Sequence, residues 1–284
     1  MRSWLRRGVQ VASFGLFVVL LAYTFPLENI LADDLWLRFD PLVALSAMIA
    51  ARQIIPVLLI PLAFMALVGL LIGRCFCGWI CPLGALLDFW SWLVKPRQLG
   101  RPSPHLTKVK YVLLIVVLLF ALFGFQLVQW IDPLVILTRS SSLVAYPLYM
   151  KAAHQWPWLS SLAGSEAPLG TAPFFRLGLV AAAFLVVILG LSLLQPRFWC
   201  RYLCPLGAFY GALSRFPLLK RRVSEACIDC GKCAHWCKTG AIRPDELRGR
   251  DASECILCLE CERVCPPKAT RFVVGGTEQH TQSG

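Results

Sequence analysis

The chain has 284 residues, of which 57% are hydrophobic and 15% charged. Its mean hydropathy of +0.64 is typical of a membrane protein rather than of a water-soluble globule. The net charge of +12 would suggest nucleic-acid binding in a soluble protein. Here the bases flank apolar segments, which favours contact with anionic lipid, and we expect no nucleic-acid partner.

Four apolar stretches approach the length that a helix needs to cross a bilayer. They are residues 8–26, 54–73, 111–130 and 177–194. The first follows three arginines, as a signal peptide would, but no small-residue cleavage site comes after it, so we interpret it as an uncleaved helix. The sequence therefore predicts an α-helical membrane domain with four transmembrane helices over residues 1–222.

The distribution of Lys and Arg predicts how this domain is oriented. Bases gather before the first stretch, between the second and third, and after the fourth, whereas the other two loops carry fewer. Cytoplasmic loops are the ones enriched in Lys and Arg. We therefore expect a multi-pass protein of the bacterial inner membrane with both termini in the cytoplasm.

The membrane part also repeats itself. Residues 74–85 and 197–208 share an arginine, two cysteines and the run Pro-Leu-Gly-Ala at matching positions, and Asp40-Pro-Leu-Val is echoed by Asp132-Pro-Leu-Val. Each unit would be a helix, an outer DPLV turn, a second helix and an inner CxxxCP joint. Two parallel units imply a pseudo-twofold axis along the membrane normal. Short apolar pieces are expected as helices on or dipping into the outer face, at residues 41–50 and 143–149.

The CxxxCP joints place Cys77 and Cys81, and likewise Cys200 and Cys204, four residues apart, on one face of a helix. The proline after each second cysteine should end one helix and begin an amphipathic one on the inner leaflet. If the two joints face each other, their four thiolates could hold a third metal centre, either an iron–sulfur cluster or a soft metal ion. Redox-active dithiols or simple packing are the alternatives. Cys75 has no counterpart in the repeat, and we expect it to pack.

The last quarter of the chain carries two runs of the form C-x2-C-x2-C-x3-C, from Cys227 to Cys237 and from Cys255 to Cys265. This spacing holds [4Fe–4S] clusters. Zinc prefers two separated pairs of ligands, and disulfides need an oxidising compartment. The sequence predicts two [4Fe–4S] clusters in a cytoplasmic domain over residues 223–274, followed by a disordered tail at 275–284.

These runs resemble a two-cluster bacterial ferredoxin domain, which implies an α+β fold and crossed ligation. One cluster would then bind Cys227, Cys230, Cys233 and Cys265, and the other Cys255, Cys258, Cys261 and Cys237. Pro266 fits the family pattern, but Lys238 stands where the first run would carry proline. We expect Lys238 to tune the potential of the cluster bound by Cys237.

With the two joints included, the whole chain resembles the membrane ferredoxin-type proteins of the NapH/MauN kind. It also resembles the membrane halves of NosR and of the copper-oxidase assembly protein CcoG. The resemblance implies an electron-transfer component rather than a stand-alone enzyme, with no catalytic residues. It would pass electrons between the clusters and a quinone, another ferredoxin-type subunit or a periplasmic reductase. Metal reduction or maturation of a copper or other metalloenzyme, and redox sensing, are the alternative functions.

Overall fold

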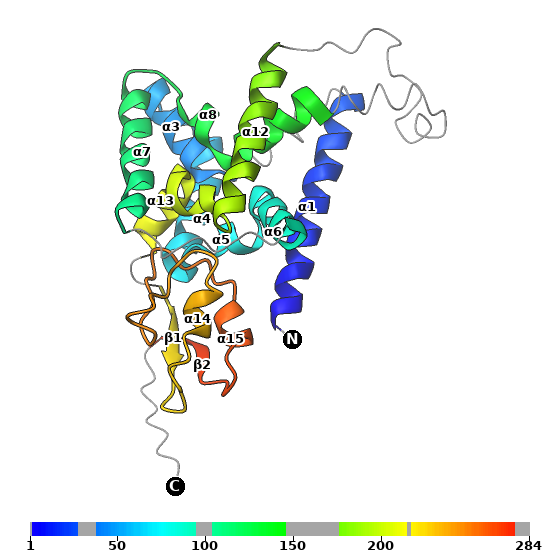
Figure 1. The fold of residues 1–284 in the computed structure, drawn as a ribbon. Coiled ribbons are helices and arrows are strands. Elements are labelled where there is room, and N and C mark those ends of the chain that lie inside the picture. The colour runs from blue at the N-terminus through cyan, green and yellow to red at the C-terminus, as the bar shows by residue number, and fades with distance from the viewer. Residues whose placement is uncertain (1, 28–37, 95–103, 146–175, 215–216, 276–284) are drawn as a thin grey trace, which may run out of the picture.

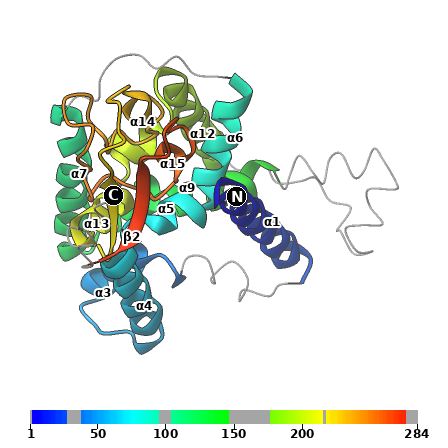
Figure 2. The same ribbon diagram turned by 90° about the horizontal axis from the view of Figure 1, so that it is seen from below.

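The structure is a computed structural model that describes residues 2–27, 38–94, 104–145, 176–214 and 217–275. Figure 1 shows two parts, a group of helices and, below it, a small domain formed by the last described residues. Seen from below in Figure 2, this domain lies under the centre of the helical part, and α1 and α4 project to its sides.

Four long helices lie where the sequence predicts apolar spans: α1 (Arg2–Leu27), α4 (Pro56–Ile72), α7 (Pro104–Leu122) and α12 (Arg176–Leu194). The third ends earlier than expected because the chain turns at Gly124, which has φ +82°, before the short helix α8 (Val128–Ile131). In the described part of the chain, only the segment Trp4–Leu21 is both long and apolar enough to cross a membrane by itself. Four transmembrane helices therefore stay a prediction.

Each DPLV motif begins a short helix. Asp40 caps α3 (Pro41–Ala51), and Asp132 caps α9 (Pro133–Ser140), which continues into the π-helical turn η1 (Ser141–Ala145). The sequence explains this start, because an aspartate at the N-cap accepts from free backbone N–H groups and proline suits the first helical position. The expected helix at 143–149 falls partly in η1 and otherwise lies outside the described residues.

The joints differ from the expected geometry. We predicted that both cysteines of each joint lie on one face of a long helix that ends at the following proline, but α4 stops at Ile72 because Gly73 adopts φ +88°. The first cysteines instead lie in separate short turns, α5 (Cys75–Trp79) and the π-helical η2 (Trp199–Leu203). Helices α6 (Pro82–Val94) and α13 (Pro205–Leu213) then begin at the prolines, as predicted.

Corresponding helices of the two halves make corresponding contacts. Helix α3 packs on α4 as α9 packs on α12, and α1 contacts α5 and α6 as α7 contacts η2 and α13. The halves meet where α6 packs on α12 and α9, and where α13 packs on α4 and α3. Both joints consequently lie inside one buried apolar cluster.

The C-terminal domain is held by a two-stranded antiparallel sheet of β1 (Leu219–Val223) and β2 (Thr270–Val274). Its short helices are α14 (Lys232–His235) and α15 (Glu260–Arg263), which contact each other. The expected domain boundary between residues 222 and 223 falls inside β1. The sheet is tied to the helical part just before β1, where the Leu218 N–H donates to the Leu71 carbonyl at 2.9 Å.

Candidate functional site

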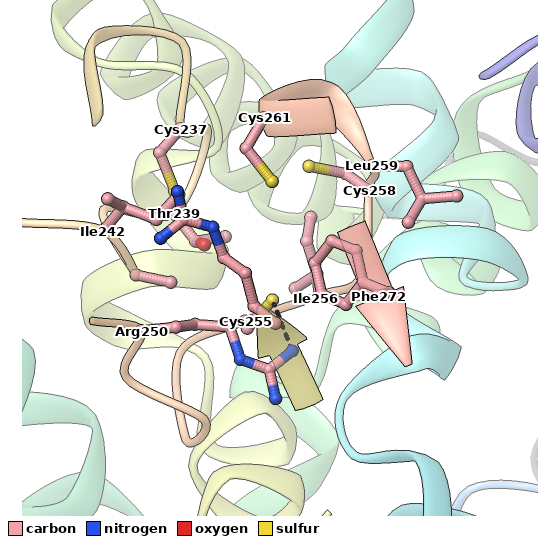
Figure 3. A pocket seen from close by; sticks show the side chains of 12 residues that line it. Cys237, Thr239, Ile242, Arg250, Cys255, Ile256, Cys258, Leu259, Cys261 and Phe272 are labelled. Carbon is pink, nitrogen blue, oxygen red and sulfur yellow. Dashed lines mark hydrogen bonds between the residues drawn. The ribbon is translucent and has the colours of Figure 1, made fainter. Parts of the chain in front are cut away.

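A cavity in the C-terminal domain is lined by four cysteines, Cys237, Cys255, Cys258 and Cys261 (Figure 3). Cys237 follows α14, Cys255 and Cys258 lie in the loop before α15, and Cys261 lies in α15. In that loop Leu257 and Leu259 adopt left-handed backbone conformations, with φ of 52° and 60°. These are the cysteines that the ferredoxin resemblance implies for one of the two clusters. Four thiols around one cavity suit that role, although the ligand set stays a prediction.

Two arginines, Arg221 and Arg250, line the same cavity as these thiols. Arg250 lies with Nη1 3.6 Å from the Cys255 sulfur and is fixed by a hydrogen bond to the Leu219 carbonyl. Burial raises the pKa of Cys255, and the pKa of Cys258 to about 11, while Arg250 favours the thiolate of Cys255. A metal centre that binds here must therefore displace protons, and its own positive charge offsets the cost of buried thiolates.

The other predicted ligand set, Cys227, Cys230, Cys233 and Cys265, is more open. Cys230 is exposed and the other three are partly exposed. Its first loop turns through two left-handed positions, Asp229 at φ 47° and Gly231 at φ 71°. The two sets thus differ in access to solvent. Among the described residues, no group of three or more His, Cys, Asp or Glu side chains has the spacing of a single metal-ion site.

The structure brings the four joint cysteines together. All four are buried, with at most 6% of the residue exposed, and they belong to one apolar cluster. Cys77 lies within electrostatic range of Cys81, Cys200 and Cys204. Burial raises the pKa of Cys200 to about 11, against the opposing effect of Arg197. Cys75 is half-buried beside Cys77.

Two buried arginines cross between the halves. Arg74, from the first half, donates to the Cys200 carbonyl at 3.1 Å, and Arg197, from the second, donates to the Cys77 carbonyl at 2.8 Å. The glycines of the two Pro-Leu-Gly-Ala runs make room for them. A Cβ on Gly207 would lie 2.6 Å from Arg74 Nη2, and one on Gly84 would lie 2.8 Å from the Cys77 carbonyl oxygen and 3.4 Å from Arg197 Nη2.

Each crossing arginine also binds a buried carboxylate. Arg197 pairs with Asp88 at 2.9 Å, and Arg6 and Lys238 bind the same carboxylate at 3.1 and 2.9 Å. Burial alone would raise the pKa of Asp88, but Arg197, Lys238 and Arg6 together hold it well below its usual range. The Lys238 that departs from the family pattern is thus an anchor between the C-terminal domain and α6.

Arg74 pairs with Glu254 at 2.9 Å, and Lys110 binds the same carboxylate. Glu254 immediately precedes Cys255, so this ion pair joins the cysteine-lined cavity to the joint. Sequence reasoning missed both carboxylates as functional residues. Their signal was visible: Asp88 is the one acid among the bases between the second and third apolar stretches.

The cavity loop rests directly on the first joint. The Trp79 indole N–H donates to the Leu257 carbonyl at 3.0 Å. A Cβ on Gly78 would lie 2.1 Å from the Ile256 carbonyl oxygen, so only glycine permits this approach. The cysteines thus form a partly exposed set, a set around a cavity, and a buried set at the joints, and the second set contacts the first joint.

Comparisons with known proteins agree with this geometry. A family model described as a 4Fe-4S binding domain matches twice, over residues 54–101 and 177–224, and each match contains one CxxxCP joint. A 4Fe-4S dicluster domain matches residues 226–274. No solved structure matches the chain.

Several curated proteins match along most of the chain. The ferredoxin-type protein NapH of Haemophilus influenzae is 25% identical over 91% of this chain and 82% of its own length. The methylamine utilization ferredoxin-type protein MauN of Paracoccus denitrificans is 27% identical over 90% and 82%. The regulatory protein NosR of Pseudomonas aeruginosa is 33% identical over 75% of this chain, which corresponds to 27% of NosR.

Proposed function

We propose that this chain carries electrons between its C-terminal clusters and a redox partner in or across a membrane. The chain matches the NapH/MauN-type ferredoxin proteins and is related to NosR. Those matches support an iron–sulfur electron-transfer protein with 4Fe-4S domains.

The observation that carries the proposal is the order of the three cysteine sets by burial. Cys230 is open to solvent, the next set lines a cavity, and the joint cysteines are buried. Iron–sulfur clusters supply one-electron redox chemistry when bound. The residues of this chain would bind them, exclude water from the joint cysteines, and place the second set against the first joint through Trp79 and Gly78.

Membrane insertion is supported by the outer faces of the long helices. Large apolar side chains there are open, including Ile60 at 76%, Val186 at 66% and Val112 at 58% exposed. Apolar surface on this scale is unfavourable in water and suits a bilayer. We propose that four helices cross the membrane and that both ends of the chain are cytoplasmic. We also propose that a pseudo-twofold axis relates the two halves, and the reciprocal contacts of Arg74 and Arg197 support this symmetry.

The joint cysteines are proposed as a third metal or redox centre between the soluble clusters and the membrane. Arg74 and Arg197 would offset the charge of the thiolates, since both lie within electrostatic range of Cys77. A factor that delivers metal to another protein needs accessible thiols, whereas these are buried. The geometry therefore favours a fixed centre over metal delivery. A quinone or a periplasmic reductase system is the proposed partner beyond it.

Metal analysis and EPR test the proposal. Full-length protein reconstituted without oxygen and reduced with dithionite should hold about eight irons from two [4Fe–4S] clusters. Fewer than about seven irons per chain would contradict the two-cluster assignment. Cys77→Ser with Cys200→Ser should remove a further metal or redox signal and leave those clusters intact, and Cys75→Ser serves as the control. An unchanged metal content and activity in the double variant would show that the joints are structural turns and bind no metal or redox centre.

A further inference from the structure

The two DPLV aspartates meet in the middle of the helical part. Asp40 and Asp132 are both 0% exposed. The Oδ1 atom of each accepts a backbone N–H at the start of its own helix, from Leu42 and from Leu134, both at 2.9 Å. The two carboxyl groups lie within hydrogen-bonding reach of each other. The repeat thus places the N-cap aspartates of α3 and α9 next to each other in the protein interior.

This contact requires a proton. The Oδ2 atoms of both aspartates are buried, and no N–H or O–H group among the described residues donates to them. Neither aspartate has an ion-pair partner in the described ranges. Two bare carboxylates would repel each other strongly where no water screens them. One carboxylic acid that donates to one carboxylate satisfies both, and the single remaining charge lies at two helix N-termini, where it is favoured.

The aspartate pair lies within electrostatic range of the joint cysteines. Asp132 acts on Cys204, and Asp40 acts on Tyr210, which Cys77 and Cys81 also influence. Tyr210 is fully buried, stacks on Phe76 at 5.7 Å between ring centres, and its phenol oxygen has no hydrogen-bond partner in the described part of the chain. A change of charge at the joint is therefore felt by the pair.

Among the described residues of the surrounding elements, the charged side chains either bind other groups or, like Lys108 on α7, are exposed. Helices α3 and α9 pack against α4, α6, α7, α8, α12, α13 and η1. From these elements, Cys204 and Tyr210 are the titratable groups that interact with the pair. On α6 and α7, Asp88 pairs with Arg197 and Lys110 with Glu254. On α9, Arg139 donates to Gln129.

We propose that Asp40 and Asp132 form one proton-binding site, which takes up a proton when the metal centre proposed at the joint cysteines gains an electron and releases the proton when that centre loses one. The coupling rests on the proposed electron-transfer function. One electron from the C-terminal clusters adds one negative charge at the joint. One proton from water converts the acid–carboxylate pair into two carboxylic acids, so the total charge of joint and pair does not change. Buried charge is costly, and this exchange avoids it.

Infrared spectroscopy tests the shared proton without relying on activity. Wild-type protein should show the carbonyl band of a buried carboxylic acid that shifts in D₂O. Asp132→Asn should keep the fold, because the amide can donate to Asp40, but it should abolish that band. Asp245→Asn, at an exposed position, is the matched control. A wild-type protein without the band, or a band that survives in both Asp40→Asn and Asp132→Asn, would overturn the site.

Redox titration tests the coupling. The signal that disappears in the Cys77→Ser, Cys200→Ser variant should shift by about 59 mV for each pH unit, the value for a tenfold change in a one-electron equilibrium. Asp132→Asn should flatten this dependence, and Asp245→Asn should not. Equal slopes in all three proteins, or no joint signal in wild type, would refute the coupling. Iron content and EPR of the same samples test the proposed function separately, since the carboxylic acid band does not depend on iron.

Discussion

The C-terminal domain and the joints both gather cysteines, but they do so by opposite means. In the C-terminal domain the thiols come from tight loops with left-handed residues and from the short helices α14 and α15, and all but Cys261 are at least partly exposed. At the joints the thiols come from two halves of the chain and are buried behind crossing arginines. The first arrangement follows from local spacing, whereas the second depends on the whole tertiary structure. Substitutions in the two regions should therefore have different effects on metal content and on stability.

The largest contrast should appear in metal content. Cys258→Ser removes a thiol from the cavity and should eliminate about four of the eight irons expected for two clusters. Cys81→Ser should leave those eight in place and alter only the additional joint signal. Iron analysis with EPR on both variants checks this. Equal iron losses from the two variants would show that the regions do not bind separate centres.

Asp88→Ala should have the greatest effect on stability. It leaves Arg6, Arg197 and Lys238 without their shared carboxylate, and loss of one partner from a buried ion pair costs about 3–5 kcal/mol. Thermal unfolding in detergent should show a lower unfolding temperature for Asp88→Ala than for wild type, because the contact between the helical part and the C-terminal domain is weakened. Asp245→Ala, at an exposed position, is the control. A stability like that of the control would mean that the cations do not depend on Asp88.

The ion pairs of Asp88 should also make the stability of the protein depend on pH. Because its neighbours hold the pKa of Asp88 well below its usual range, its stabilisation is complete above the ordinary aspartate value of about 3.9 and is lost as the pH falls toward the folded-state pKa. The stability difference between wild type and Asp88→Asn should therefore be constant near neutral pH and shrink in acid. A difference that grows in acid would contradict this assignment.

Gly78→Ala should weaken the contact between the two regions. Its Cβ would meet the Ile256 carbonyl, and forcing atoms into a packed site costs about 1–3 kcal/mol. Slower reduction of the joint centre by the C-terminal clusters is the expected readout, with iron content unchanged. Gly15→Ala, with no atom within 4 Å of the new Cβ, is the control. Identical transfer rates would show that the cavity loop need not touch the joint.

The smallest effect is expected from Trp79→Phe. This change removes one hydrogen bond, to the Leu257 carbonyl, and should cost about 1 kcal/mol. The loss of stability is measured by comparing the thermal unfolding of Trp79→Phe with that of Trp92→Phe, a control at a position that is 70% exposed. If Trp92→Phe proves equally damaging, the loss would reflect the aromatic ring rather than the hydrogen bond.

The comparison also explains which features the sequence could predict. The resemblance to two-cluster ferredoxins implied that Cys237 joins Cys255, Cys258 and Cys261, and the structure places these four cysteines around one cavity. That they bind one cluster stays a prediction. Apolar stretches located the four long helices, but α1 and α7 begin at Arg2 and Pro104 rather than at residues 8 and 111, and α7 ends at Leu122 rather than at residue 130. The ion pairs of Asp88 and Glu254 link residues far apart in the chain, and no local pattern encodes such partners. The separate turns at the joints depend on the backbone at Gly73 and Arg197, both with positive φ.

The crossing arginines also determine the order in which the molecule can be completed during synthesis. Cys77 leaves the ribosome 120 residues before Arg197, and Arg74 emerges 180 residues before Glu254. The first joint therefore exists without Arg197 while 120 of the 284 residues are made, and the second half must be made before either joint can close. The carboxylate for Arg74 arrives last, together with the cysteine runs. Contacts of such high sequence separation form late in folding, so a truncated chain would expose unpaired arginines and thiols rather than leave a working half.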